Sequence, residues 1–205
     1  DAIAIGNGAS ATLTNSITIG GTSTTGGVSM GVSSVAGGLA VALGKSASAS
    51  SDFSIGIGSS VSSSNTGALS IGKSAVASGQ YSTAIGYEAE STSNFATALG
   101  WNTESNAYMG LSLGSATEVN HAGSIVLGSG FSAGASALVS TATNQLTVGF
   151  NSATPTMVIG ATSDSYIKTT GELSLESNGL LMPRLTTAQR NAISTPSTDL
   201  VIFNT

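Results

Sequence analysis

Residues that could carry chemistry are few and scattered in this chain. Only 7% of its 205 residues are charged, it has no cysteine, and His121 is its single histidine. An enzyme site needs titratable groups that converge in one place. Serine is so frequent that a Ser-His-Asp set can be picked out anywhere, and Gly37-Gly38 lacks the lysine and the following helix of a phosphate-binding loop. We therefore expect no enzymatic activity, no catalytic residue, no cofactor and no metal site.

The charge balance also limits the partners. The net charge is -5, with only five Lys+Arg residues, whereas nucleic-acid binding needs clustered basic residues. No apolar run approaches the roughly 18 residues that a membrane-spanning helix requires. We expect no nucleic-acid partner and no direct membrane insertion of this segment.

The elements that must position any site follow a repeat of 14 residues. A signature of the form apolar-x-Ile/Leu/Val-Gly ends at glycines 14 apart, at Gly44, Gly58, Gly72, Gly86, Gly100, Gly114 and Gly128. Earlier copies end at Gly6 and Gly20, and an irregular stretch containing Gly31 follows. We number the positions of each coil from 1 to 14, with glycine last, and call the residues at one position in successive coils a column.

Within a coil the pattern alternates with period two, which predicts two short strands. Column 13 is always Ile or Leu, column 11 is mostly apolar, and columns 3 and 5 are mostly small. This pattern predicts an all-β, parallel β-roll whose coils stack about 4.8 Å apart. We expect columns 11 and 13 to line the interior opposite columns 3 and 5. The bulky members of column 9, namely Phe53, Tyr81, Phe95 and Met109, are expected to pack in the roll or at its corner.

Columns 10 and 12 are nearly all Gly, Ala or Ser. A solvent-facing surface has no need to be both small and free of charge, whereas small residues let backbones approach closely. We therefore expect column 12 to pack several rolls about a common axis; the alternative is a monomer with a Ser-rich face. The predicted axis-packing residues are Gly56, Ser70, Ala84, Ala98 and Ser112.

One surface pattern could bind a ligand. Three glutamates share column 4, and two aromatic residues share column 1, so stacking should bring each set together. Acidic columns often just keep a surface solvated, and aromatic residues often cover turns; the functional alternatives are a stripe for a cation or basic ligand, and a carbohydrate or protein contact. The predicted patch comprises Tyr87, Glu88, Glu90, Trp101, Glu104 and Glu118.

After Gly128 the spacing changes, which predicts two domains: a roll at 1–128 and a β-rich connector or tip module at 129–205. One short helix is expected there, with Thr186 as N-cap, Gln189 at N3 and Pro196 closing the segment. Because the sequence starts without Met and stops in a strand-like run, we expect the chain to continue. The extended segments predicted in this module are 145–149, 156–160, 165–169, 172–176, 180–185 and 200–204.

Two segments resemble known families. The coils KSAVASGQYSTAIG (73–86) and YEAESTSNFATALG (87–100) resemble head repeats of trimeric autotransporter adhesins of the YadA type, with the likeness extending over 45–128 and loosely over 1–44. That resemblance implies a left-handed parallel β-roll, three chains side by side, and adhesion to a host surface or matrix. Thr83 and Thr97 depart from it, because they stand where the family has an apolar residue.

The run GLLMPRLTTAQRNAISTPSTDLVIFNT (179–205) resembles a connector of phage tail fibres and of long bacterial surface fibres. The two resemblances together imply a non-enzymatic, homotrimeric fibre adhesin that attaches to a glycan or protein on a host or prey surface. Such a protein would lie outside the cell, on an outer-membrane-attached fibre. The alternative is a bacteriophage tail fibre, located on the virion tail, that carries a YadA-like roll for host attachment.

Overall fold

The computed structural model describes residues 1–12, 14–24, 26–130, 137–151, 153, 155 and 157–159, together with the backbone of three short strands further on. The chain divides into two compact units, Asp1–Thr170 and Gly171–Thr205. All secondary-structure elements assigned in the described residues are strands, so this part of the chain is all-β. It contains no helix long and apolar enough to cross a membrane. The predicted helix at 186–196 and the predicted strand at 172–176 lie outside the described residues.

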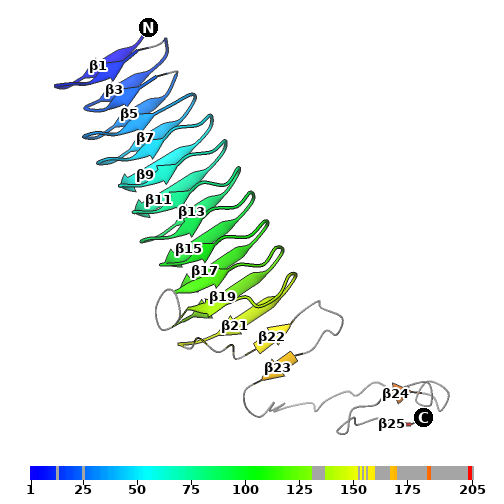
Figure 1. Ribbon diagram of the computed structural model, residues 1–205. Coiled ribbons are helices and arrows are strands. Elements are labelled where there is room, and N and C mark those ends of the chain that lie inside the picture. Colours follow the sequence, from blue (N-terminus) through cyan, green and yellow to red (C-terminus); the bar gives the residue numbers. More distant parts are fainter. Residues whose placement is uncertain are drawn as a thin grey trace. The chain divides into compact units, whose positions relative to one another are not determined.

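The first unit is a parallel β-solenoid built from two sheets, as predicted, with its coils stacked one on another (Figure 1). Each regular coil contributes one strand to each sheet. The 13-stranded sheet contains β1 (Ile3–Ile5), β3 (Ile17–Ile19), β5 (Val28–Met30), β7 (Val41–Leu43), β9 (Ile55–Ser59), β11 (Leu69–Lys73), β13 (Thr83–Ile85), β15 (Thr97–Trp101), β17 (Leu111–Ser115), β19 (Ile125–Ser129), β21 (Leu146–Gly149), β22 (Met157–Ile159) and β23 (Ile167–Thr169).

The second sheet has ten short strands, which lie opposite those of the first. In both sheets the neighbours are one coil apart in sequence, so each strand pairs with the strands of the coils before and after it. The strands are β2 (Ser10–Ala11), β4 (Thr22–Ser23), β6 (Val35–Ala36), β8 (Ser48–Ala49), β10 (Ser62–Ser63), β12 (Val76–Ala77), β14 (Glu90–Ser91), β16 (Glu104–Ser105), β18 (Thr117–Val119) and β20 (Leu138–Val139).

The 14-residue period is the register of these sheets. Leu69 pairs with Ile55 on one side and with Thr83 on the other, and the same offset holds along the regular coils. The irregular stretch between Gly20 and Gly44 forms two shortened coils around β5, which pairs with β3 and β7. The stacking rise is therefore about 4.8 Å per coil throughout.

The parallel pairing continues past the last regular coil. Strand β21 pairs in parallel with β19 across a 21-residue spacing, and β22 and β23 then follow in antiparallel order. These three strands confirm the extended segments predicted near 145–149, 156–160 and 165–169. The compact unit thus ends at Thr170, and a functional boundary at 128/129 stays a prediction.

The second unit has one described feature. Strands β24 (Arg184–Leu185) and β25 (Phe203–Asn204) pair in parallel, with Arg184 opposite Phe203. They lie within the extended segments predicted at 180–185 and 200–204.

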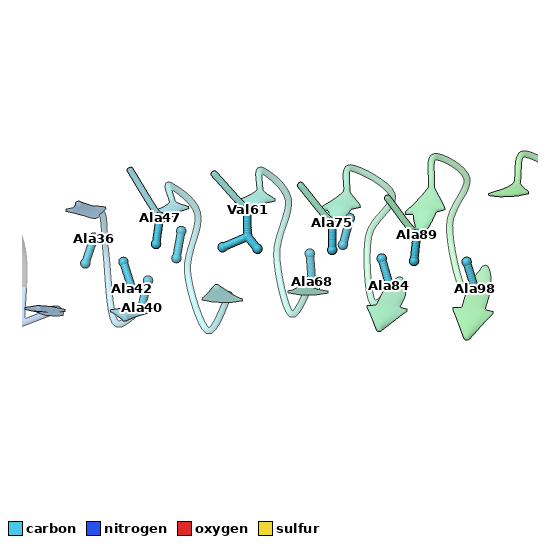
Figure 2. Close-up of a cluster of buried hydrophobic side chains, with 12 residues drawn as sticks. Ala36, Ala40, Ala42, Ala47, Val61, Ala68, Ala75, Ala84, Ala89 and Ala98 are labelled. Carbon is cyan, nitrogen blue, oxygen red and sulfur yellow. The ribbon is translucent and has the colours of Figure 1, made fainter. Parts of the chain in front are cut away.

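Small side chains fill the space between the two sheets of the roll. Figure 2 shows Ala47, Val61, Ala75 and Ala89, each directly before a strand of the ten-stranded sheet, pointing toward side chains such as Ala84 of the opposite sheet. Columns 3 and 5 therefore face inward, as predicted. Their partners across the interior are columns 10 and 12, whose members are fully buried at Ser54, Ala68, Ser70, Ser82, Ala84, Ala96, Ala98, Ser112, Ser124 and Val126.

This arrangement corrects the assignment of the two faces. The predicted axis-packing residues Gly56, Ser70, Ala84, Ala98 and Ser112 lie inside the roll of a single chain, so they cannot contact another chain. Columns 11 and 13, predicted to line the interior, point outward instead. The physical reason is the narrow gap between the sheets: a Cβ built on Gly56 would lie 3.1 Å from the Ser48 carbonyl oxygen of the facing strand. Only small residues fit there.

The regular recurrence of glycine at position 14 has a backbone cause. At Gly86 φ is +137°, a conformation that residues with a side chain rarely adopt. A Cβ at this position would also collide with the carbonyl oxygen of Gly100 in the next coil. Column 14 is therefore glycine because the chain turns there at close contact between coils.

The interior also contains hydroxyl groups, and these differ in their hydrogen bonding. Ser63 Oγ donates to the Ile55 carbonyl at 2.7 Å and lies 2.5 Å from Ser70 Oγ, while Ser112 Oγ donates to the Thr117 carbonyl at 2.9 Å. Four buried hydroxyls of the described residues have no protein partner: those of Ser91, Thr103, Ser105 and Thr147. An orphaned hydroxyl in a buried position lowers stability.

Candidate interaction surfaces

The predicted glutamate column exists on the ten-stranded sheet. Strands β14, β16 and β18 pair in register, with Glu104 between Glu90 and Glu118. All three are half-buried. Partial burial and, to a smaller extent, the negative charge of Glu104 raise the pKa of Glu90. The column therefore carries crowded like charges on an outer surface.

Asparagine side chains hold this column in place. Asn106 Nδ2 donates to Glu104 Oε2 at 3.1 Å, and Asn120 Nδ2 donates to Glu118 Oε1 at 2.6 Å. Thr92 Oγ1 donates to Asn106 Oδ1 at 3.0 Å, which extends the bonding from coil to coil. We call the residues Glu90, Thr92, Glu104, Asn106, Glu118 and Asn120 the outer polar strip.

The strip is bonded within itself rather than arranged around a cation. Two of its carboxylates already accept amide hydrogens, which are not the contacts of an open cation site. Across the residues that the structure describes, no group of three or more His, Cys, Asp or Glu side chains is placed to hold a metal ion. What the strip offers is a row of polar groups for hydrogen bonding with a polar partner.

The remaining residues of the predicted patch lie at a corner of the roll. Tyr87 is 40% exposed and Trp101 is 46% exposed, one coil further on. The Lys73 ammonium lies 5.2 Å from the centre of the Tyr87 ring, a cation–π contact. A hydrogen bond with Glu88 and the charge of that carboxylate raise the pKa of the Tyr87 hydroxyl. Tyr87 and Trp101 are therefore exposed neighbours, with Glu88 and Lys73 beside Tyr87.

His121 does not form a catalytic set in the described structure. Its Nδ1 lies 3.2 Å from Ser140 Oγ, and that hydroxyl accepts the backbone N–H of Asn120 at 3.0 Å. These contacts join two successive coils, and among the described residues no carboxylate bonds to the other ring nitrogen. The histidine therefore serves the packing of a turn.

Column 9, expected to pack in the roll or at its corner, lies exposed at the surface; together with Tyr108 of column 8 we call its bulky members the exposed aromatic column. The rings of Tyr81 and Phe95 stack with centroids 5.7 Å apart, and Phe95 meets Tyr108 edge-on at 5.9 Å. Phe53, Tyr81, Phe95, Tyr108 and Met109 are 45% to 63% exposed. A signal for this was present in the sequence, because glycine alternates with these bulky residues at Gly67 and Gly123 in the same column. A core position would not tolerate that exchange.

The outer side of the 13-stranded sheet exposes rows of large apolar side chains. Columns 11 and 13 bring rows of Ile and Leu to this side, and many of these side chains are more than a third exposed. A contiguous apolar patch of this extent marks an interaction surface. We call it the outward apolar face; its most exposed members in the regular coils are Ile55, Ile57, Leu113, Ile125 and Leu127.

A parallel solenoid that presents a polar strip on one sheet and an apolar face on the other defines a class: a structural repeat protein that acts through its surfaces. Comparison with protein families agrees with this class of repeat protein. The YadA head domain repeat matches residues 1–23, 36–60, 63–89 and 77–103. A phage tail like trimerisation region matches residues 159–205. Among curated proteins, none matches the chain significantly.

The chain thus carries YadA head repeats followed by a phage tail-like trimerisation region, which confirms both resemblances. Head repeats of this kind are non-enzymatic structural domains, and YadA adhesin heads are exposed on the surface of bacteria. The trimerisation match begins at residue 159, twenty residues before the connector recognised in the sequence. The coils at 104–128 keep the same register although the repeat match ends at 103.

Proposed function

We propose that this protein is a homotrimeric fibre adhesin segment, in which three left-handed rolls pack side by side through their outward apolar faces. The observation that carries the proposal is the exposure of those Ile and Leu side chains, 36% to 40% for the five most exposed in the regular coils. Alternating residues of the same strands are fully buried small residues, so the single chain has no interior place for the large ones. The matched trimerisation region supports three as the number of chains.

The trimer also explains how so thin a roll is stable. Its interior is lined by Ala and Ser, which bury little apolar area per residue. Packing the outward apolar faces against each other would add the burial of one or two large apolar side chains per regular coil and chain. Head repeats of the YadA type, which match this unit, support the same assembly.

Light scattering in solution tests the assembly. We expect a molar mass of three times the 19.9 kDa chain. A mass of one chain at micromolar concentration contradicts the proposal.

The proposed role of the trimer is attachment to a host or prey surface, through a glycan or protein, outside the cell. The outer polar strip supports this role because it faces away from the apolar face and offers carboxylate and amide groups in a regular row. Binding of the trimer to arrays of glycans and of matrix proteins tests it. We expect a ligand on one array whose signal falls in the variant with Glu104→Ala and Asn106→Ala; unchanged binding by this variant removes the strip from the role.

A second candidate is a bacteriophage tail fibre that uses the roll for host attachment. The specific observation in its favour is the phage tail like character of the trimerisation region at 159–205. Neighbouring genes separate the two: tail and baseplate genes favour the virion, and a membrane-anchor domain in the same gene favours the bacterial surface.

A further inference from the structure

The exposed aromatic column has an unusual backbone. Phe53, Tyr81, Phe95 and Met109 all have positive φ, between 54° and 59°. This left-handed conformation is uncommon for bulky residues and natural for glycine. Gly67 and Gly123 occupy the same column with φ of 66°, so glycine serves this turn without strain. The bulky residues are therefore not required by the turn itself.

These side chains also gain little within their own chain. They are about half exposed, and their ring contacts join successive coils, from Tyr81 to Phe95 in column 9 and from Phe95 to Tyr108 in the adjacent column 8. Tyr81 and Phe95 are nearly parallel, at 20°, so the rings cover one another's faces. That stacking leaves ring edges outward, whereas a sugar would need an open ring face. The arrangement favours a protein partner with aromatic or apolar groups.

The opposite corner of the same coils carries matching groups. Tyr87 and Trp101 are at position 1 of their coils, which is also the residue after the terminal glycine of the coil before. Strand β15 extends through Gly100 to Trp101, so the indole lies at the end of the outward apolar face, six residues from Phe95 at its other end. The apolar face is thus bordered by aromatic residues on both sides.

Cyclic symmetry decides which residues would meet. In a trimer about an axis parallel to the stack of coils, a threefold rotation moves no residue along that axis. The corner of each roll that carries column 9 then lies beside the corner of the next roll that carries column 1, at the same height along the axis. Phe95 of one chain is therefore level with Tyr87 and Trp101 of its neighbour, and Tyr81 is level with Lys73 and Tyr87.

Over most of the regular coils, the size of the residue at position 9 and the size of the residues at the opposite corner, at position 1, change together. The coils at 73–114 have aromatic or large residues at both corners, while the coil at 115–128 has Ser115, Gly123 and Ser129 there. Two coils depart from this: at 45–58, Phe53 faces the level of Lys45 and Ser59, and at 59–72, Gly67 faces the level of Ser59 and Lys73. Matched occupancy at two corners of one chain, about 20 Å apart along the strand, has no explanation within that chain.

We propose that the occupant of the aromatic column is a second copy of this chain: Tyr81, Phe95, Tyr108 and Met109 of each roll pack against Tyr87 and Trp101 of the next. The contact forms an intersubunit aromatic seam along the three corners of the trimer. It rests on the proposed trimer and adds to it the side chains that set which edges meet. It also reassigns Tyr87 and Trp101 from the predicted ligand patch to the assembly, leaving the outer polar strip as the ligand-facing surface.

Engineered cysteines test the seam directly, because these 205 residues contain no cysteine. The double variant Phe95→Cys with Trp101→Cys should yield covalent dimers and trimers with a short bifunctional maleimide. Within one chain the two positions are about 20 Å apart, too far for that reagent. Each single variant supplies one corner only and should stay uncross-linked. A matched control, Phe95→Cys with Ser50→Cys at the exposed residue after β8, should also stay uncross-linked.

Fluorescence gives a second readout, since Trp101 is the only tryptophan. The native trimer should show emission of a buried indole and protection from iodide quenching. Phe95→Gly should shift the emission to longer wavelength and remove the protection, because glycine keeps the turn but leaves the seam open. Phe53→Gly, at a turn remote from Trp101, should change neither.

The outcomes separate the seam from the trimer. A mass of three chains, with no cross-linking of the double variant and with Trp101 fully quenchable, overturns the seam and leaves the trimer standing. The same result would return Tyr87 and Trp101 to the surface available for a ligand. A mass of one chain overturns the proposed function and the seam together.

Discussion

Neighbouring residues of one strand face two different environments in this molecule. In β13, Ala84 is fully buried between the sheets of its own roll, while Thr83 and Ile85 point outward. The same alternation recurs in β15 and β17. The small residues build the roll, and the large residues build the surface of the roll. Stability of the coil and stability of the assembly therefore depend on different columns, which mutations can separate.

The comparison inverts a familiar expectation about burial. Large apolar side chains usually fill the interior of a chain, and small ones are found wherever space is short. Here the sheets lie so close that the interior accepts only Ala, Ser, Gly and a few Val or Thr residues. The large residues are then left for contacts between chains.

The strongest way to test the comparison is to exchange size between the two faces. Ala84→Leu adds three heavy atoms to an interior without free space, and we expect it to lower the free energy of unfolding by about 3 kcal/mol per chain. Thr83→Leu is the matched control, because Leu69 and Leu111 already occupy that outward column. It should be neutral or stabilise the trimer by up to about 1 kcal/mol. Urea unfolding followed by circular dichroism measures both. A larger loss of stability in Thr83→Leu than in Ala84→Leu would show that the inward and outward faces have been assigned the wrong way round.

A smaller effect is expected from hydroxyl groups inside the roll. Ser63 and Ser91 share column 5, yet Ser63 is hydrogen-bonded and the Ser91 hydroxyl has no protein partner. Ser63→Ala should cost about 1 kcal/mol, whereas Ser91→Ala should raise stability by up to about 1 kcal/mol. Thermal unfolding of the two variants side by side tests this. An equal loss of stability in both variants would show that the Ser91 hydroxyl is hydrogen-bonded in solution.

The smallest effect is expected on the outer polar strip. Because the pKa of Glu90 is raised on folding above its ordinary 4.5, the folded protein holds that proton more tightly than the unfolded chain. The contribution to stability is therefore present at acid pH and declines as the pH rises through and above 4.5. Glu90→Gln should remove this decline and stabilise the protein at pH 7 by a few tenths of a kcal/mol, since the group is partly exposed. Unfolding curves between pH 4 and 7 measure it.

A second variant separates the two causes of that shift. Glu104→Gln removes the neighbouring charge but leaves the partial burial of Glu90, so it should reduce the pH dependence without abolishing it. A pH dependence that is the same in the native protein and in Glu90→Gln would contradict the assignment.

Much of this fold was predictable because period and register are properties of the sequence. The glycines 14 apart predicted the coils, and alternation within each coil predicted two strands. What alternation could not predict is which of its two faces closes, since a period of two is unchanged when the faces are exchanged. Gly56 shows the deciding fact, the closeness of the facing strand, and that distance exists only in the folded chain.

The candidate site was predicted in part for the same reason. Stacking in register brought Glu90, Glu104 and Glu118 together, as the spacing required. The asparagine contacts that hold these carboxylates depend on side-chain directions, which the spacing does not specify. The exposure of column 9 was not predicted because Phe95 shares the alternation of columns 11 and 13, and the sequence could not show that these columns face outward.

The most direct test of the central claim is the chemical accessibility of the outward apolar face. Leu113 is 38% exposed in a single chain, and in the proposed trimer it is covered by neighbouring chains. A single cysteine at Leu113→Cys should therefore react with maleimide slowly in the native protein and rapidly in urea. Ser50→Cys, at the exposed residue directly after β8, should react rapidly in both states. Native Leu113→Cys reacting as fast as Ser50→Cys would contradict the account.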